Sequence, residues 1–130
     1  MLSKEITIKV DLGKYRHVTL SADEATKLLN KVCEITGKRT SDVDEVLRYI
    51  SNFDVFYEVM RKKFKDALAP PRTVDDMIRG NVVIDKVRLF KEDDEKKVTI
   101  IFDRRVPLDI IEKALRDLGY EVKVEREVMY

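Results

Sequence analysis

Aromatic and basic side chains share one stretch of the sequence, Phe53–Leu68, which reads FDVFYEVMRKKFKDAL. Aromatic rings stack on nucleobases and neighbouring cations hold phosphates, so this combination suits a site for single-stranded nucleic acid. An amphipathic helix with its aromatic side chains in the core has the same spacing. The stretch therefore indicates either a binding surface or a core helix, and the two interpretations are not exclusive.

Helical spacing divides this stretch into two faces. The apolar face, which we expect to be buried, contains Phe56, Met60 and Phe64. On the other face Glu58 precedes Lys62 by four residues, the order that favours an ion pair, and Lys62 precedes Asp66 by four. These pairs still leave an excess of positive charge. We expect the cations to be exposed and to line a groove: Arg61, Lys62, Lys63 and Lys65.

A second candidate site lies on a predicted sheet. Apolar and polar residues alternate over Ile6–Leu12, and a second strand follows Gly13, which predicts a hairpin. A two-residue turn would set Ile8 against Thr19. A three-residue loop instead sets Ile8 against Val18, and we prefer it because it keeps the apolar side chains on one face.

The residues Ile84–Phe90 and Lys96–Phe102 alternate in the same way and predict a second hairpin. The two hairpins together place aromatic and basic side chains on the face opposite the apolar one. That face carries Lys9, Tyr15, His17, Lys86, Arg88 and Phe90. Such a face is a workable platform for stacking bases, unless helices cover it or it is simply solvated.

Helix signals separate the two hairpins. Ser21 and Glu24 form a capping box, and Gly37 ends that helix. Further helices are predicted over Ser41–Asn52, Phe53–Leu68, Thr73–Gly80 and Pro107–Gly119, and a last strand begins at Tyr120. The predicted caps are Ser41 for the second helix and Thr73 for the fourth.

These elements predict a single α+β domain over residues 1–130. An antiparallel sheet of four or five strands is expected, with a helical insertion between the two hairpins and a C-terminal helix–strand unit. No run of residues is long and apolar enough for a signal peptide or a membrane span, so we expect a cytoplasmic protein without membrane contact.

Charge and composition limit the classes of protein to which this chain can belong. The 26 basic and 25 acidic residues almost cancel, which excludes a strongly basic nucleic-acid binder and requires any binding to come from local patches. Charged residues make up 39% of the chain, Gln is absent and Asn occurs three times. This composition is typical of a heat-adapted protein, and we expect a thermophilic, archaeal source.

Signals for catalysis are weak. His17 is the only histidine, which excludes a metal cluster or triad built from several histidines of one chain. The acidic clusters at 42–45, 75–76 and 92–95 lie at predicted helix starts and a hairpin tip, where carboxylates are ordinary. We expect no catalytic residue, no bound metal and no cofactor.

The strand ITIKV, the helical block Ser21–Gly80 and the late strands VRLF, VTIIF and YEVKV resemble one family in architecture, size and composition. It is that of the ThermoDBP-type single-stranded-DNA-binding proteins of thermophilic archaea. The resemblance implies that single-stranded DNA is held in a cleft between an antiparallel sheet and helices by aromatic and basic side chains.

The sequence thus favours a non-catalytic protein that binds nucleic acid, most plausibly single-stranded DNA or RNA. The alternative is a domain for protein interaction or assembly, which includes a homo-oligomer. Apolar residues at the C-terminal end favour this alternative because they could pack on a partner: Val128, Met129 and Tyr130.

Overall fold

The computed structural model describes residues 4–128 and has the predicted α+β fold. Its strands are β1 (Glu5–Val10), β2 (Arg16–Ser21), β3 (Ile84–Glu92), β4 (Glu95–Phe102) and β5 (Glu121–Arg126). Its helices are α1 (Ala22–Thr36), α2 (Ser41–Ser51), α3 (Phe53–Lys62), α4 (Val74–Arg79) and α5 (Leu108–Asp117). None of the helices in this part of the chain is long and apolar enough to cross a membrane.

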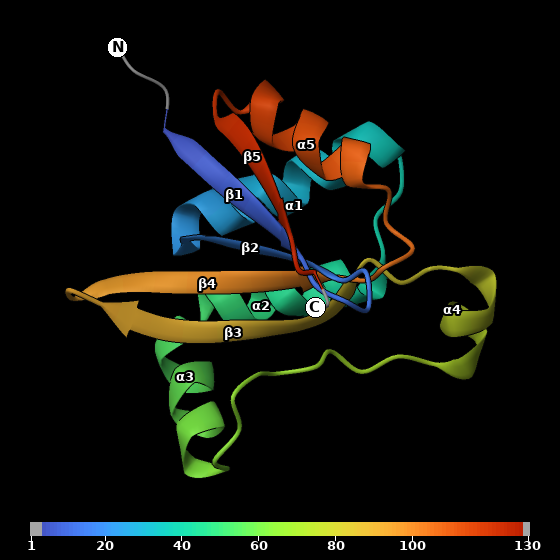
Figure 1. Ribbon diagram of the computed structural model, residues 1–130. Coiled ribbons are helices and arrows are strands. Elements are labelled where there is room, and N and C mark those ends of the chain that lie inside the picture. Colours follow the sequence, from blue (N-terminus) through green and yellow to red (C-terminus); the bar gives the residue numbers. More distant parts are fainter. Residues whose placement is uncertain (1–3, 129–130) are drawn as a thin grey trace.

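The five strands form one sheet in the order β3-β4-β2-β1-β5 (Figure 1). The first four are antiparallel to their neighbours, as predicted, but β5 lies parallel to β1. The expectation of a wholly antiparallel sheet is therefore wrong for this strand. The reason is the connection: α5 carries the chain back over the sheet after β4, so that β5 runs in the direction of β4.

The register predicted for the first hairpin is confirmed. Ile8 pairs with Val18 and Lys9 with His17, which leaves a three-residue loop of Leu12, Gly13 and Lys14. Loops of this length place one residue in the left-handed conformation, and here Lys14 has a φ of 71°. The register keeps the apolar side chains of both strands on one face.

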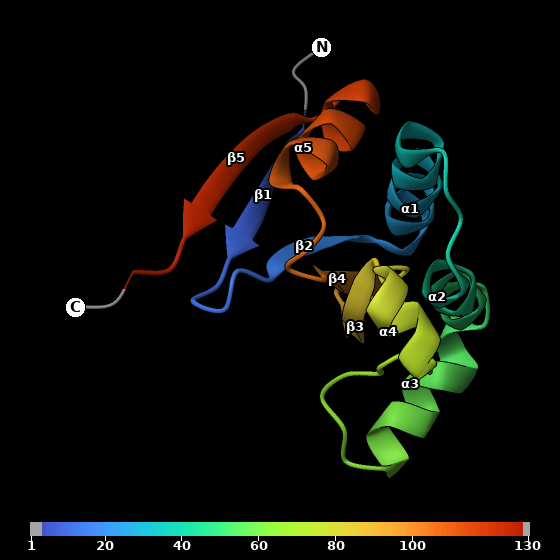
Figure 2. The same cartoon turned by 90° about the vertical axis from the view of Figure 1, so that its right-hand side faces the viewer.

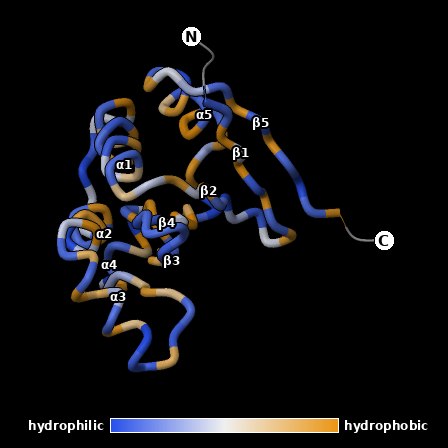
Figure 3. The backbone as a smooth tube through the Cα atoms, turned by 90° about the vertical axis from the view of Figure 1, so that its left-hand side faces the viewer, coloured by the Kyte–Doolittle hydropathy of each residue, from blue (hydrophilic) through white to orange (hydrophobic). Residues whose placement is uncertain are grey.

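Helices α1, α2 and α5 lie on that face of the sheet (Figure 2). The inner face of the sheet is the face beneath them, and its side chains, such as Ile8, Val18 and Ile100, are fully buried. Along β1 and β5 hydrophobic and hydrophilic positions alternate (Figure 3), so each strand turns one set of side chains toward the helices and the other set away.

The capping box at the start of α1 is confirmed and has further partners. Ser21 accepts a hydrogen bond from the Glu24 amide, and Glu24 accepts one from the Ser21 amide. Lys4 donates a hydrogen bond to Glu24 at 3.1 Å, and the Tyr120 hydroxyl donates another to Glu24 at 2.7 Å. Burial raises the pKa of Glu24, but these donors outweigh burial and lower the pKa to about 2. Glu24 therefore links α1, the chain before β1 and the α5–β5 turn.

The start of α2 differs from the prediction. Thr40, not Ser41, is at the cap position, and its hydroxyl donates to Asp42 instead of capping the helix. The Asp42 carboxylate is buried and accepts hydrogen bonds from the amides of Val83 at 2.7 Å and Ile84 at 2.8 Å. Asp42 was expected only to favour the helix dipole; it also fixes α2 to the beginning of β3.

Candidate nucleic-acid interface

The outer face of the sheet, opposite the helices, has a polar row that crosses all five strands. The pairings place Lys86, Ile101, His17, Lys9 and Glu125 next to one another, in that order from β3 to β5. A second row continues the pattern with Arg88 beside Thr99 and Thr99 beside Thr19. The structure therefore brings the predicted residues Lys9, His17, Lys86 and Arg88 onto one surface.

In the described part of the chain, three cations of this outer face form no ion pair, whereas Lys97 pairs with Glu95 and Lys123 with Glu125 on the same face. Lys9, Lys86 and Arg88 are exposed, and within residues 4–128 none of them has a carboxylate within ion-pair distance. Exposed cations elsewhere often have an acidic neighbour, such as Lys96, which lies 3.2 Å from Asp54. Unpaired cations on an open face remain available for phosphate groups.

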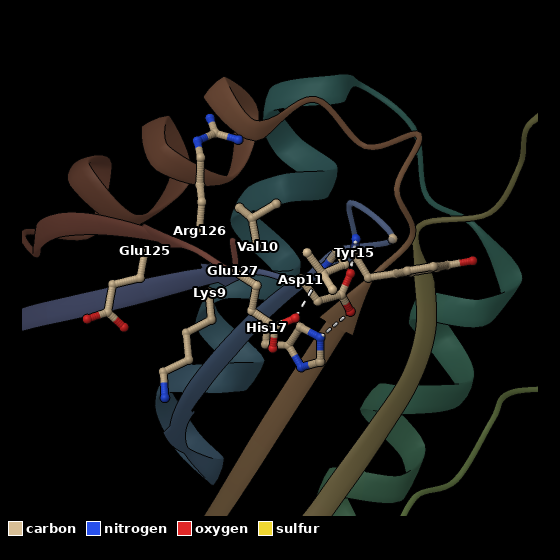
Figure 4. A pocket seen from close by; sticks show the side chains of 10 residues that line it. Lys9, Val10, Asp11, Tyr15, His17, Glu125, Arg126 and Glu127 are labelled. Carbon is tan, nitrogen blue, oxygen red and sulfur yellow. Dashed lines mark hydrogen bonds and ion pairs between the residues drawn. The ribbon is translucent and has the colours of Figure 1, made fainter. Parts of the chain in front are cut away.

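The two predicted aromatic residues of this surface differ in position. Phe90 lies on the outer face opposite Lys97, is half-buried and does not pack on the core. Tyr15 follows the hairpin loop, accepts a backbone hydrogen bond from Asp11 and directly precedes β2, so it does not lie within the strand as expected. Its ring extends away from Lys9 and His17 (Figure 4), so Tyr15 does not form one continuous platform with them.

Beside the hairpin loop lies an open hollow of about 860 Å³ between β1, β2 and the end of β5. His17 faces it, and its Nε2 is 2.9 Å from Oδ2 of Asp11 (Figure 4). Burial raises the pKa of Asp11, but hydrogen bonds from His17 and the Tyr15 amide outweigh it and leave the pKa below its usual value. Asp11 thus holds the His17 ring in place on the outer face.

Helix α3 ends earlier than predicted. It stops at Lys62, where the Phe64 amide donates to Arg61 and the Lys65 amide donates to Met60. These two bonds form a Schellman motif, in which Phe64 has a φ of 52°. The prediction that Phe64 is buried is wrong: its side chain is 97% exposed. The chain leaves the helix to reach β3, where Leu68 pairs with Val87.

The other apolar residues of α3 belong to the fold. Phe53 and Met60 are buried, and Phe56 and Tyr57 pack against the core. Asp54 pairs with Lys91 at 3.5 Å and Lys96 at 3.2 Å, which fixes α3 to the β3–β4 hairpin. Of the aromatic residues in the Phe53–Leu68 stretch, only Phe64 is free for a ligand.

The charges of this stretch are arranged differently from the prediction. Glu58 pairs with Arg61 at 3.6 Å, not with Lys62, and the helix ends before Lys62 can pair with Asp66. Lys62, Lys63 and Lys65 are exposed and form no ion pair in the described part of the chain. We call Arg61–Lys65 the basic tip; in the sequence its cations stand on both sides of the exposed Phe64.

The segment after the basic tip leads back to the sheet. Asp66 and Ala67 line a shallow hollow of about 400 Å³ together with residues of the outer face: His17, Lys86, Arg88, Thr99 and Ile101. The two candidate sites of the sequence are therefore neighbours along one surface. Ile101 is 4% exposed and Thr99 8%, so the floor of this hollow is firmly packed.

Two residues of this surface escaped the sequence analysis. Asp11 falls on the same alternating face as Lys9, and this spacing could have identified it as a neighbour of His17. Phe64 could not be recognised from the pattern, because its spacing from Met60 continues the helical stripe and only the backbone shows where the helix ends.

The comparisons with known proteins identify no relative. No protein-family model matches the chain, and searches of curated proteins and of solved structures find no significant similarity. The function is therefore argued from the geometry described above.

Proposed function

We propose that this protein binds single-stranded nucleic acid along the outer face of the sheet and the basic tip, without catalysis. One observation carries the proposal: within residues 4–128 no helix covers the outer face, and this face holds unpaired cations on β1 and β3. Lys9, Lys86 and Arg88 contact phosphates, while the rings of Phe90 and Phe64 stack on bases. Tyr15 at the hairpin loop adds a third ring at one end.

Single strands fit this surface better than duplexes. Aromatic side chains reach the faces of bases only where the bases are unstacked. The near-zero net charge gives no long-range attraction for a uniformly charged duplex, so binding depends on local contacts. The proposal agrees with the ligand class implied by the resemblance to ThermoDBP-type proteins.

The test is fluorescence anisotropy with a labelled oligonucleotide, titrated at several salt concentrations. Each phosphate contact should contribute a slope of about −0.7 to log K against log salt. Arg88→Ala should flatten that slope by about one contact. Lys27→Ala is the matched control, since Lys27 is an exposed cation on α1, the opposite side of the sheet, and should leave the slope unchanged.

Two results would overturn the proposal. One is the absence of binding to single-stranded DNA and RNA even at low salt. The other is binding that Lys27→Ala weakens as much as Arg88→Ala, which would show attraction by charge alone. A duplex of the same sequence serves as competitor and should compete poorly.

The alternative, a protein-interaction domain, has its own observation. On α4 the apolar side chains of Val74 and Ile78 are 72% and 78% exposed and lie four residues apart, on one side of the helix. Val128 is also exposed, whereas Met129 and Tyr130 lie outside the described residues. A Val74→Ser/Ile78→Ser variant that folds and keeps its oligonucleotide affinity, yet no longer captures a protein partner, would favour this alternative.

A further inference from the structure

The sheet has one edge that no part of residues 4–128 covers. At the other edge, Leu68 exchanges two backbone hydrogen bonds with Val87 of β3, of 2.8 and 2.9 Å. Strand β5 has β1 on one side and no further strand on the other (Figure 2). Its six residues contain no proline, and its pairing with β1 is regular from Glu121 to Arg126. An uncovered regular edge is a template for another strand.

The hydrogen bonds of β5 show which backbone groups are free. The Glu121 amide donates to Lys4, and the Glu127 amide donates to Val10. Because backbone groups alternate in direction along a strand, the residues of odd number bond to β1. The N–H and C=O groups of Val122, Val124 and Arg126 therefore point outward, toward the uncovered edge.

We propose that a second copy of this chain adds its own β5 to this edge, antiparallel and centred on Val124. In that register Val124 faces Val124 of the second copy, and Val122 faces Arg126 of the second copy. By symmetry, Arg126 faces Val122 of the second copy. All three pairs use the outward backbone groups, so the two residues of each pair exchange two hydrogen bonds. The inference does not depend on nucleic-acid binding.

The side-chain charges select this register. On the outer face β5 alternates Glu121, Lys123 and Glu125, with Lys123 Nζ 3.7 Å from Glu125 Oε1. Centring on Val124 sets Lys123 of each copy opposite Glu125 of the other, which gives two pairs of opposite charge. Both pairs occupy non-hydrogen-bonded positions, where facing side chains are closest. The like-charged pairs of Glu121 with Glu127 lie at the two ends.

Other two-fold registers fit less well. Centring on Lys123 sets Lys123 opposite its own copy and Glu121 opposite Glu125, so every facing charge is alike. Centring on Glu125 sets two copies of that carboxylate against each other. Centring on Val122 pairs charges correctly but overlaps only the three residues Glu121–Lys123 of each β5. The favoured register alone sets Lys123 opposite Glu125 on both sides of the centre while Val122–Arg126, five of the six residues of β5, overlap with the second copy.

Charge reversal tests the pairing directly. Lys123→Glu should self-associate about tenfold more weakly than the parent chain, because glutamates then face one another, and Glu125→Lys should do the same with lysines. A mixture of the two variants restores both opposite pairs and should form a heterodimer. Sedimentation equilibrium of each variant and of the mixture measures this. A mixture that associates no better than its components overturns the proposal, and so does a parent chain that stays monomeric at its highest soluble concentration.

Amide hydrogen exchange distinguishes this edge from any other contact. Protection of the Val122, Val124 and Arg126 amides should rise with protein concentration, because only the second copy bonds to them. The Lys123 and Glu125 amides, bonded to β1, are the internal control and should be protected at every concentration. Dimerisation without added protection at Val122 and Val124 would place the contact elsewhere and contradict the proposal.

Discussion

On the inner face of the sheet, side chains such as Val18 and Ile100 are completely buried under helices, whereas on the outer face Lys86 and Arg88 are exposed. Both faces are built from alternate residues of the same strands, as in β3, where Val87 and Leu89 are buried and Lys86 and Arg88 are exposed. The inner side chains have little freedom because they fill a packed core. Within residues 4–128, Lys86 and Arg88 form no ion pair, so we expect them to contribute little to stability. Substitutions on the inner face should therefore lower the free energy of unfolding far more than substitutions on the outer face.

The largest effect is expected from Phe102→Ala on the inner face. Phe102 is 0% exposed and is among the largest fully buried side chains. Its removal leaves a cavity, and the free energy of unfolding should fall by about 3–5 kcal/mol in urea denaturation. Lys86→Ala on the outer face should change it by less than about 0.5 kcal/mol. Equal losses in both variants would contradict the division of the sheet into two faces.

A smaller loss is expected from Asp42→Ala. The substitution leaves the buried amide of Ile84 and the partly buried amide of Val83 without their acceptor and should cost about 2–4 kcal/mol of unfolding free energy. Asp44→Ala is the control in the same helical turn, since Asp44 is exposed and pairs only with Arg39. Its loss in the same denaturation assay should be much smaller. If Asp42→Ala is neutral, the link between α2 and β3 contributes nothing to stability.

The pH dependence should follow Glu24. Its pKa is about 2 in the folded protein against an ordinary 4.5, so the unfolded chain binds a proton first as the pH falls. The stabilisation is complete above pH 4.5 and is lost as the pH falls through about 2. The full difference in pKa corresponds to about 3–4 kcal/mol, which screening by solvent at this partly exposed carboxylate lowers to about 2–3 kcal/mol. Urea denaturation at several pH values should show this loss of unfolding free energy in the parent but not in Glu24→Gln. If the unfolding free energies of the two proteins fall in parallel with pH, Glu24 is not the cause.

The smallest effect on stability is expected at Phe64 in the basic tip. Two substitutions there distinguish the contribution of the backbone conformation from that of the aromatic ring. Phe64 occupies a left-handed conformation that glycine adopts without strain, so Phe64→Gly should raise the unfolding free energy by about 1 kcal/mol. Phe64→Ala keeps the strained backbone and should leave stability nearly unchanged. Both variants lose the ring and should bind the oligonucleotide more weakly by about 1–3 kcal/mol. Unchanged binding in both would remove Phe64 from the proposed interface.

Most of the fold could be predicted because its signals are local. Strand alternation gave the register of Ile8 with Val18, and the capping box at Ser21 located the start of α1. The prediction failed at the end of α3, where the local pattern favours a longer helix but the chain must turn toward β3. The helical stripe continues to Phe64, yet the helix ends at Lys62 because the chain turns back toward β3.

Only part of the candidate site could be predicted from local sequence patterns. Lys9, His17, Lys86 and Arg88 were assigned to one face because strand alternation fixes the direction of each side chain. No pattern shows that α1, α2 and α5 pack on the other face, nor that the segment after α3 brings Asp66 beside Lys86 and Arg88.

By itself the sequence determined the periodicity, the caps of α1 and α4 and the face on which each strand residue lies, since these depend on neighbours a few positions away. The tertiary structure decided the parallel placement of β5, the exposure of Phe64 and the role of Asp42 as a link between α2 and β3. Each of these depends on groups that are distant in the chain and meet only when the helices pack on the sheet, and local spacing carries no information about such contacts.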